Sequence, residues 1–252
     1  MMPNVITIDA SNLDIEHICC AITDKKGETC VSSKKAWMKS QFANGLKFKK
    51  LDFRGKVFIE YIPAEKAWAP INAKGYIYIN CLWVSGQYKG KGHSNILLDE
   101  CIDDAKKHGY SGLVILSSNR KRAFLSDPSY LMHKGFVVCD EASPFFKLMY
   151  LPFKKDAPIP KFNECCKNGS IPEKGVVLYC TNQCPFISKF VPIVQDTATE
   201  NGLKLDVRHI QSMEDAQSCP SPYTTYALFK DGKFLTNEIL TDSKFKKLII
   251  EG

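Results

Sequence analysis

The stretch LWVSGQYKGKGHSNILL, residues 82–98, decides which fold this chain can have. It begins inside YIYINCLWV, a run dense in β-branched and aromatic residues that predicts a strand, and it ends in a helical pattern. The glycines at positions 90 and 92 let the backbone turn so that successive N–H groups point into one concavity. The positive end of the following helix dipole adds to their effect. With Lys89 and Lys91 beside them, these groups predict a pyrophosphate-binding loop.

The loop matches neither GxxxxGK[ST] nor GxGxxG, so the glycines alone also allow a simple flexible turn. The segment that follows, residues 94–108, has the period of an amphipathic helix, and Gly109 is placed to end it. Its apolar face consists of Leu97, Leu98, Cys101, Ile102 and Ala105.

The rest of the first 150 residues predicts a mixed α+β domain. Residues 14–22 and 33–43 have helical patterns. Strands are expected at VITID (5–9), LKFKKLDF (46–53), KVFIEYIP (56–63), LVIL (113–116), FVVCD (136–140) and FFKLMYL (145–151). The last two are expected to close the sheet as an antiparallel pair.

Composition restricts the class of protein. No apolar run approaches the roughly 20 residues of a membrane span, and no signal peptide is evident, so we expect no membrane partner. Eleven cysteines, an odd number, favour a reducing cytoplasm over a disulfide framework. Most of the formal charge of +7 lies in residues 1–153, which carry 21 basic and 15 acidic residues. This excess suits an anionic ligand, but its scatter does not favour nucleic acid.

Residues 151–175 are rich in proline and predict a linker or a wrapping segment. Beyond them the pattern β-α-β-(α)-β-β-α predicts a second, small domain. Its helix is expected at 185–201, with Pro185 at the first position and Pro192 inside, and a final helix at 242–250. Strands are expected at VVLY (176–179), LKLDVRHI (203–210), TTYALF (224–229) and KFLTNEI (233–239), the last two joined by the hairpin turn Asp231-Gly232.

The quoted stretch resembles motif A of the GNAT superfamily of acyl-CoA N-acyltransferases: a strand, then (Gln/Arg)-x-x-Gly-x-(Gly/Ala), then a helix. The residues Gln87-x-x-Gly90-x-Gly92 match this pattern literally. We prefer the register Lys89-Gly90-Lys91-Gly92-His93-Ser94, because it keeps the family's spacing to the Leu97-Leu98 pair. In this register Lys replaces Gln/Arg and Ser replaces the final small residue. The resemblance covers residues 1–152 and implies a GNAT-like mixed sheet flanked by helices.

The resemblance also implies the cofactor and its contacts. Acetyl-CoA would lie with its pantetheine arm along the backbone of the motif A strand, where that strand splays from its neighbour. The residues implied in cofactor binding are Leu82, Trp83, Val84, Lys89, Gly90, Lys91, Gly92, His93, Ser94 and Asn119. A tyrosine four residues before the glycine of Gly135-Phe136 often serves as the acid in this family; here that position is Leu131. Tyr130, one residue away, is therefore the candidate acid, and Glu60 is the candidate base. The alternative for Tyr130 is an aromatic side chain that only packs in the core. The alternative for Glu60 is a solvent-exposed carboxylate on a face of the sheet.

In the second domain, LYCTNQCPFISKF (178–190) places Cys184 directly before a helix, where a thiolate is stabilised. This turn resembles that of thioredoxin-like proteins, glutaredoxins especially. It lacks the resolving cysteine at Ile187, for which Cys180 would substitute, and Pro222 is the candidate for the family's cis-proline. One alternative is an inert scaffold with a buried Cys184. Another is a metal site formed by Cys180, Cys184 and Cys219, or by Cys165 and Cys166.

A GNAT domain (1–152), a linker (153–174) and a thioredoxin-like domain (175–252) together resemble the YoaP-type acetyltransferases. The resemblance implies transfer of an acetyl group to a small-molecule or peptide amine. A thiol-redox or thiol-sensing protein, and a CoA-responsive module without turnover, stay open as alternatives. Trp37, Phe42 and Trp68 either line the acceptor pocket or belong to the core. The sequence leaves the acceptor and the oligomeric state open.

Overall fold

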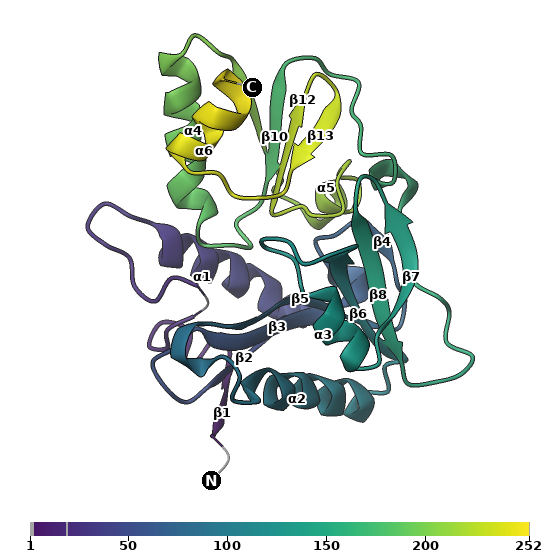
Figure 1. The fold of residues 1–252 in the computed structure, drawn as a ribbon. Coiled ribbons are helices and arrows are strands. Elements are labelled where there is room, and N and C mark those ends of the chain that lie inside the picture. The colour runs from purple at the N-terminus through teal and green to yellow at the C-terminus, as the bar shows by residue number, and fades with distance from the viewer. Residues whose placement is uncertain (1–2, 19, 252) are drawn as a thin grey trace.

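The computed structural model describes residues 3–18 and 20–251 and contains two main sheets (Figure 1). We call residues up to 152 the N-terminal part and residues from 175 onward the C-terminal part. The N-terminal sheet has seven strands in the order β1-β2-β3-β5-β6-β8-β7. These are β1 (Val5–Ile8), β2 (Lys47–Leu51), β3 (Val57–Pro63), β5 (Ile77–Val84), β6 (Gly112–Ser118), β7 (Val137–Ala142) and β8 (Phe146–Pro152). All pairs are antiparallel except β5 with β6. The predicted strands and the closing β7–β8 pair are confirmed.

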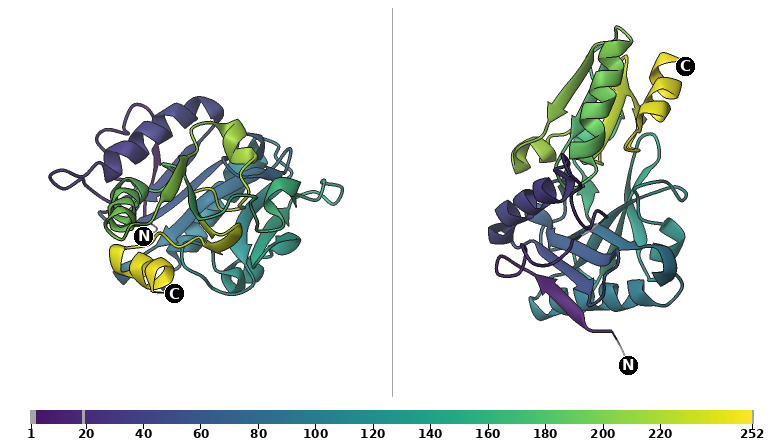
Figure 2. Two further views of the ribbon diagram at one scale, coloured as in Figure 1. Left: turned by 90° about the horizontal axis from the view of Figure 1, so that it is seen from above. Right: turned by 90° about the vertical axis from the view of Figure 1, so that its left-hand side faces the viewer.

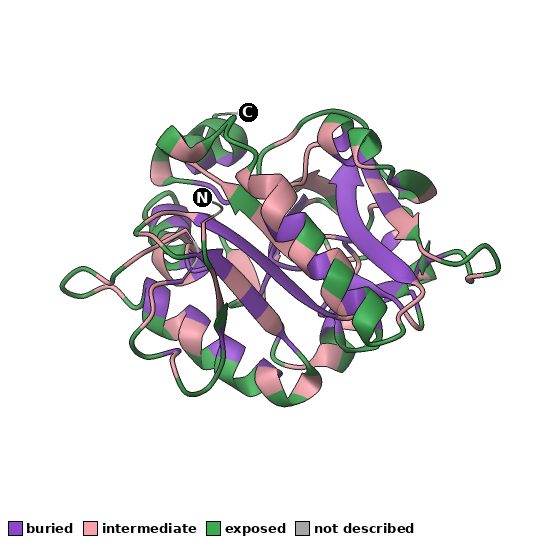
Figure 3. Cartoon of the chain, turned by 90° about the horizontal axis from the view of Figure 1, so that it is seen from below, coloured by how far each residue is buried: buried purple, intermediate pink, exposed green. Residues whose placement is uncertain are grey.

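Two apolar layers cover the faces of this sheet. On one face lies α2 (His93–Lys107), which buries Leu97, Leu98, Cys101 and Ala105 as its sequence pattern predicts. On the other face lies α1 (Cys30–Gln41), together with the short β4 (Ile71–Asn72). The central strands β3 and β6 are almost wholly buried, whereas the helices carry exposed residues on their outer sides (Figure 3). This layering matches the predicted mixed sheet flanked by helices.

One predicted helix is wrong: residues 14–15 belong to a turn, and residues 16–18 and 20–22 have bends or irregular backbone. The Asp9 carboxylate accepts hydrogen bonds from the Ser11 amide and hydroxyl, and the Asn12 side chain accepts one from the Asp9 amide. Such local bonds compete with the helical ladder, and the isoleucines that follow are weak helix formers. Cys19 lies outside the described residues. The second predicted helix corresponds to α1 and the 3₁₀ turn Phe42–Asn44.

The C-terminal part has a four-stranded sheet in the order β11-β10-β12-β13, with β10 and β11 parallel. Its strands are β10 (Val176–Cys180), β11 (Leu205–His209), β12 (Tyr226–Lys230) and β13 (Lys233–Thr236). Its helices are α4 (Ile187–Glu200), α5 (Met213–Gln217) and α6 (Asp242–Phe245), the last continued by the π-helical Lys246–Ile250. Helix α4 begins two residues after Pro185, which lies in the preceding turn, and Pro192 lies inside it. Asp231 and Gly232 both have positive φ, as the predicted hairpin turn requires.

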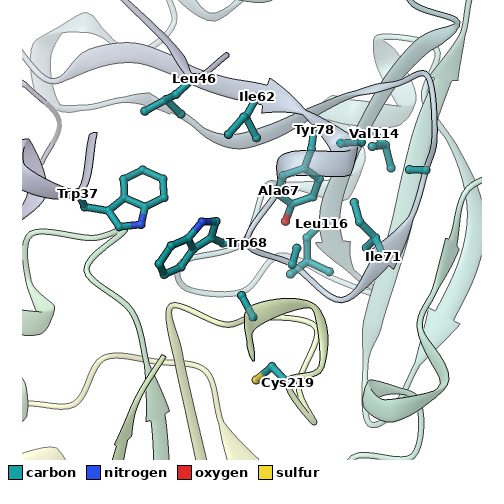
Figure 4. Packing of buried hydrophobic residues seen from close by; sticks show 14 of the residues in the cluster. Trp37, Leu46, Ile62, Ala67, Trp68, Ile71, Tyr78, Val114, Leu116 and Cys219 are labelled. Carbon is teal, nitrogen blue, oxygen red and sulfur yellow. The ribbon is translucent and has the colours of Figure 1, made fainter. Parts of the chain in front are cut away.

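The segment predicted as a linker or wrapping segment wraps around the N-terminal part. Its short strand β9 (Lys161–Phe162) pairs with β4, and the Asn163 amide donates to the Pro70 carbonyl. The two parts share a core, in which Ile210, Ala216 and Cys219 pack into the cluster that holds Trp68 (Figure 4). They are therefore stacked with the termini at opposite ends (Figures 1 and 2).

Candidate active site

The N-terminal sheet opens between β5 and β6, the parallel pair among its described strands. Strands β5 and β6 are bonded from Ile77 to Ile79, opposite Leu113 to Ile115, and their pairing ends there although both strands continue. The bonds between β5 and β3 shift register at the same level, between Glu60 and Tyr61. Residues 80–84 therefore present a backbone edge that β6 does not fill, which is the slot the motif A resemblance implies.

The glycine loop continues from this edge. Gly90 and Gly92 have φ of +74° and +77°, values that residues with a side chain rarely adopt, and a Cβ at either would meet nothing within 4 Å. Gly92 is the N-cap of α2 and no side chain caps that helix. Among the described residues, the amides of positions 90–94 donate to no protein acceptor. The loop thus leaves its N–H groups free to bind an anion at a positive helix end.

Aromatic packing holds the loop in place. The Phe53 and Tyr88 rings stack with centroids 4.4 Å apart, and His93 lies against both at 5.6 and 6.2 Å. A Cβ on Gly55 would come within 2.4 Å of the Tyr88 ring, so only glycine fits there. His93 is half-buried, and its Nδ1 has no hydrogen-bond partner within residues 3–18 and 20–251.

The slot and the loop open into one cleft of about 740 Å³. Its lining includes the predicted residues Leu82, Trp83, Val84, Lys89, Gly90, Gly92, His93, Ser94 and Tyr130. The opposite wall is the segment Lys121–Asp127, which follows β6. Neither Lys91 nor Asn119 lines the cleft, and both are exposed. The Asn119 amide instead donates to the Phe145 carbonyl.

Tyr130 comes from α3 (Pro128–His133), a helix whose start is capped by the Asp127 carboxylate. Its hydroxyl donates to the Asn95 side chain at 3.4 Å. Burial raises the pKa of the Tyr130 hydroxyl, a hydrogen bond with Ser94 works against this rise, and the charge of Asp99 adds to it. A phenol in this position keeps its proton at neutral pH and can give it up within the cleft.

Glu60 is not the solvated sheet-face carboxylate of the alternative interpretation. It is 2% exposed and its Oε2 lies 2.5 Å from the Nζ of Lys34, a residue of α1 that is itself 1% exposed. Asn80, at the register shift, donates to the other carboxylate oxygen at 3.0 Å. The Lys34 Nζ also lies 4.2 Å from the centroid of the Trp37 ring. Glu60 pairs with Cys81 across β3 and β5, next to the start of the open edge, and does not line the cleft.

The two tryptophans proposed for an acceptor pocket are core residues. Trp37 and Trp68 are 7% and 8% exposed and pack edge to face, with ring centroids 5.8 Å apart (Figure 4). Phe42 packs against the same cluster.

The C-terminal cysteines lack the features of a thiol pair. Cys180 is fully buried, and desolvation raises the pKa of its thiol to about 12, so it is poorly suited to resolve a disulfide. Cys184 is half-buried and interacts electrostatically with Cys20, Cys81 and Tyr223. The peptide bond before Pro222 is trans, since the cis bond in the described chain precedes Pro144; the expected cis-proline is wrong. Within residues 3–18 and 20–251, no three His, Cys, Asp or Glu side chains could hold a metal ion.

Sequence reasoning missed several residues around this site. Lys34 and Asn80 hold Glu60, but they lie 26 and 20 positions from it and no local motif links them. Helix α3 was also missed, although Asp127 before Pro128 is a strong helix-start signal.

Among the described residues, no helix is long and apolar enough to cross a membrane.

Comparisons with known proteins agree with this arrangement. Residues 26–125 match the model of the acetyltransferase (GNAT) family, and residues 205–247 match the YoaP-like family. The chain is 43% identical over 244 residues to a Bacillus subtilis protein described as "Uncharacterized N-acetyltransferase YoaP", with 97% of each chain covered. Two solved structures with a detectable likeness are the PaiA N-acetyltransferase of Thermoplasma acidophilum with coenzyme A and the GNAT family N-acetyltransferase YhbS of Escherichia coli with CoA. The first is 15% identical, covers 61% of this chain and 100% of its own, and has a TM-score of 0.43. The second is 13% identical, covers 64% and 90%, and has a TM-score of 0.42.

The identity to this relative over almost the whole chain shows an N-acetyltransferase of the GNAT class, whose co-substrate is acetyl-CoA. Within that class, the chain belongs to the YoaP family.

Proposed function

We propose that this protein transfers the acetyl group of acetyl-CoA to the amine of a small molecule or peptide, using the cleft between β5 and β6. One observation carries the proposal: an unfilled strand edge leads directly to a glycine loop whose amides are free at the start of α2. The open strand edge can bind an extended ligand arm that carries amide groups, and the free amides of the loop can bind a pyrophosphate at the end of that arm.

The residues present fit acetyl-CoA. Leu82, Trp83 and Val84 offer backbone groups along the slot, and the amides of Gly90 to Ser94 lie where the pyrophosphate would be held. Lys89 adds charge at the loop, with its Nζ 6.0 Å from the Trp83 ring. Because Lys89 lines the cleft and Gln87 does not, the lining supports the register that starts at Lys89. Asn119 has no part in this proposal.

Acetyl-CoA supplies an activated acyl group on a thiol leaving group. Attack by the amine forms a C–N bond and breaks the C–S bond, so one proton must leave the nitrogen and one must reach the sulfur. We assign the second transfer to the Tyr130 hydroxyl, which lies protonated in the cleft. We assign the first to Glu60, the one carboxylate among the buried residues of the described chain, reached through water because Glu60 does not line the cleft.

We also propose a thioredoxin-like topology for the C-terminal part and a cytoplasmic location. The order β10-α4-β11-α5-β12-β13-α6, with one parallel pair and two antiparallel pairs, supports the first. Ten cysteines without a disulfide in the described chain support the second.

The experiment measures acetyl-CoA binding by isothermal titration and CoA release with a thiol reagent, across a panel of amines and peptides. Binding together with amine-dependent release supports the proposal. No binding at millimolar acetyl-CoA refutes it, and binding without release for any amine favours a CoA-responsive module instead.

A further inference from the structure

The wall of the cleft opposite the glycine loop is strained. We call residues 120–127 the cleft wall: they are Lys121–Asp127, which line the cleft, and Arg120, which precedes them. Phe124 has φ of +64°, a conformation that is unfavourable for a residue with a bulky side chain and persists only where its surroundings impose it. Phe124 is 39% exposed and lines the cleft, so it is not held by burial.

Two sets of contacts hold the cleft wall. From the N-terminal sheet, the hydroxyls of Ser118 and Ser117 donate to the carbonyls of Arg120 and Ser126 at 2.7 and 2.8 Å. Both bonds lie at the ends of the segment. Its middle is held from the C-terminal part, where the Asn237 Nδ2 donates to the Ala123 carbonyl at 3.1 Å. That carbonyl belongs to the peptide unit directly before Phe124, so this bond fixes the orientation of the strained residue.

Asn237 is itself fixed in place. It is 4% exposed and follows β13, whose Phe234 packs edge to face on Phe145 with centroids 5.9 Å apart. The guanidinium carbon of Arg122, also in the cleft wall, lies 3.7 Å from the centroid of the same Phe145 ring. A rigid part of the C-terminal sheet therefore meets the cleft wall both directly and through Phe145.

We propose that Asn237 is a positioning residue for the cofactor cleft. By binding the Ala123 carbonyl, it keeps Phe124 in its left-handed conformation and sets the width of the cleft between the wall and the glycine loop. The C-terminal part would then contribute to acetyl-CoA affinity without touching the cofactor. This inference rests on the proposed function, since it assumes that acetyl-CoA occupies the cleft.

The test compares Asn237→Ala with a matched control, Gln217→Ala. Gln217 also carries an amide that donates from the C-terminal part to carbonyls of the N-terminal part, those of Glu65 and Ala67, both at 3.2 Å, but it lies away from the cleft. Loss of one such bond costs about 1–1.5 kcal/mol, which corresponds to a factor of roughly 5–10. We expect Asn237→Ala to raise the Kd and KM for acetyl-CoA by about that factor with kcat within about twofold. We expect Gln217→Ala to lower the melting temperature and leave the Kd unchanged.

Two further measurements separate positioning from general stability. In a Phe124→Gly background, Asn237→Ala should raise the Kd less than twofold, because glycine adopts the left-handed conformation without support. Trypsin should cleave the intact protein faster at Arg120 to Arg122 in Asn237→Ala, but not in Gln217→Ala, even if Asn237→Ala is too unstable for kinetics.

The inference is overturned if wild type binds acetyl-CoA and the two single variants have equal Kd values, or if cleavage in the wall does not change. If wild type does not bind acetyl-CoA at all, the proposed function fails and this inference fails with it, so the two failures are distinguishable.

Discussion

The glycine at the start of α2 gives the sharpest test of the cofactor site. Gly92 and Gly109 flank the two ends of the same helix, and both have φ of +77°. A Cβ added at either position would meet no other atom within 4 Å. Replacing either glycine by alanine therefore introduces the same backbone strain and no steric clash. The strain of a left-handed alanine is about 1–2 kcal/mol.

The effect on stability should be nearly equal for the two variants. For a chain of this length, 1–2 kcal/mol lowers the melting temperature by roughly 2–8 °C. The effect on the cofactor should differ, because the 15-residue helix that separates Gly109 from Gly92 is about 22 Å long and the Gly109 amide is bonded to the Lys106 carbonyl.

In Gly92→Ala, relief of the strain rotates the amides of residues 92–94 away from their common direction. A hydrogen bond to a charged group contributes about 1.5–3 kcal/mol, so the loss of one raises the Kd for acetyl-CoA by roughly 10- to 100-fold. Titration calorimetry measures the Kd, and thermal unfolding measures the shared loss of stability. Gly92→Asn should give an intermediate Kd, since asparagine tolerates the left-handed region.

Equal Kd values for Gly92→Ala and Gly109→Ala would refute the assignment of the pyrophosphate to this loop. So would an unchanged Kd in Gly92→Ala when its melting temperature falls as expected.

Three further predictions concern the chemistry. Tyr130→Phe should lower kcat by about 10² or more while the Kd for acetyl-CoA stays constant, because it removes only the proton that the sulfur needs; an unchanged kcat in steady-state assays would argue against this role. Glu60→Gln should destabilise the protein by about 3–5 kcal/mol in denaturant unfolding, because it leaves Lys34 buried without its counter-charge. The double variant Lys34→Met/Glu60→Leu should recover most of that stability but not turnover, and recovery of both would exclude Glu60 as the base. Cys184→Ser should retain wild-type kcat under reducing conditions, and a loss above tenfold would revive a thiol role.

The cofactor loop was predictable because its requirements are local. A strand that ends at Val84, two glycines that need positive φ, and an apolar stripe through Leu97 and Leu98 all act within 20 residues. Such features depend on the conformational preferences of single residues and on the spacing of apolar residues, and both can be read from one sequence. The DG hairpin turn at Asp231 was predictable for the same reason.

The rest of the site depends on contacts between distant segments. The Lys34–Glu60 pair joins α1 to β3, and a solvated carboxylate was an equally good interpretation of Glu60 from its strand pattern. The false helix at residues 14–22 shows the opposite case. There the pattern predicted a helix, but the bonds that Ser11 donates to the Asp9 carboxylate stabilise a turn instead.

Through the shared core, the C-terminal part has a structural role that requires no catalytic group of its own. Trp68 accepts hydrogen bonds at its carbonyl from Thr224 and Gln183, and packs in the cluster that contains Cys219. Removing the C-terminal part would expose this cluster and also release the cleft wall that Asn237 holds. The half-buried Cys184 is explained by its place at this junction, beside Cys20 and Cys81, without any catalytic use of its thiol.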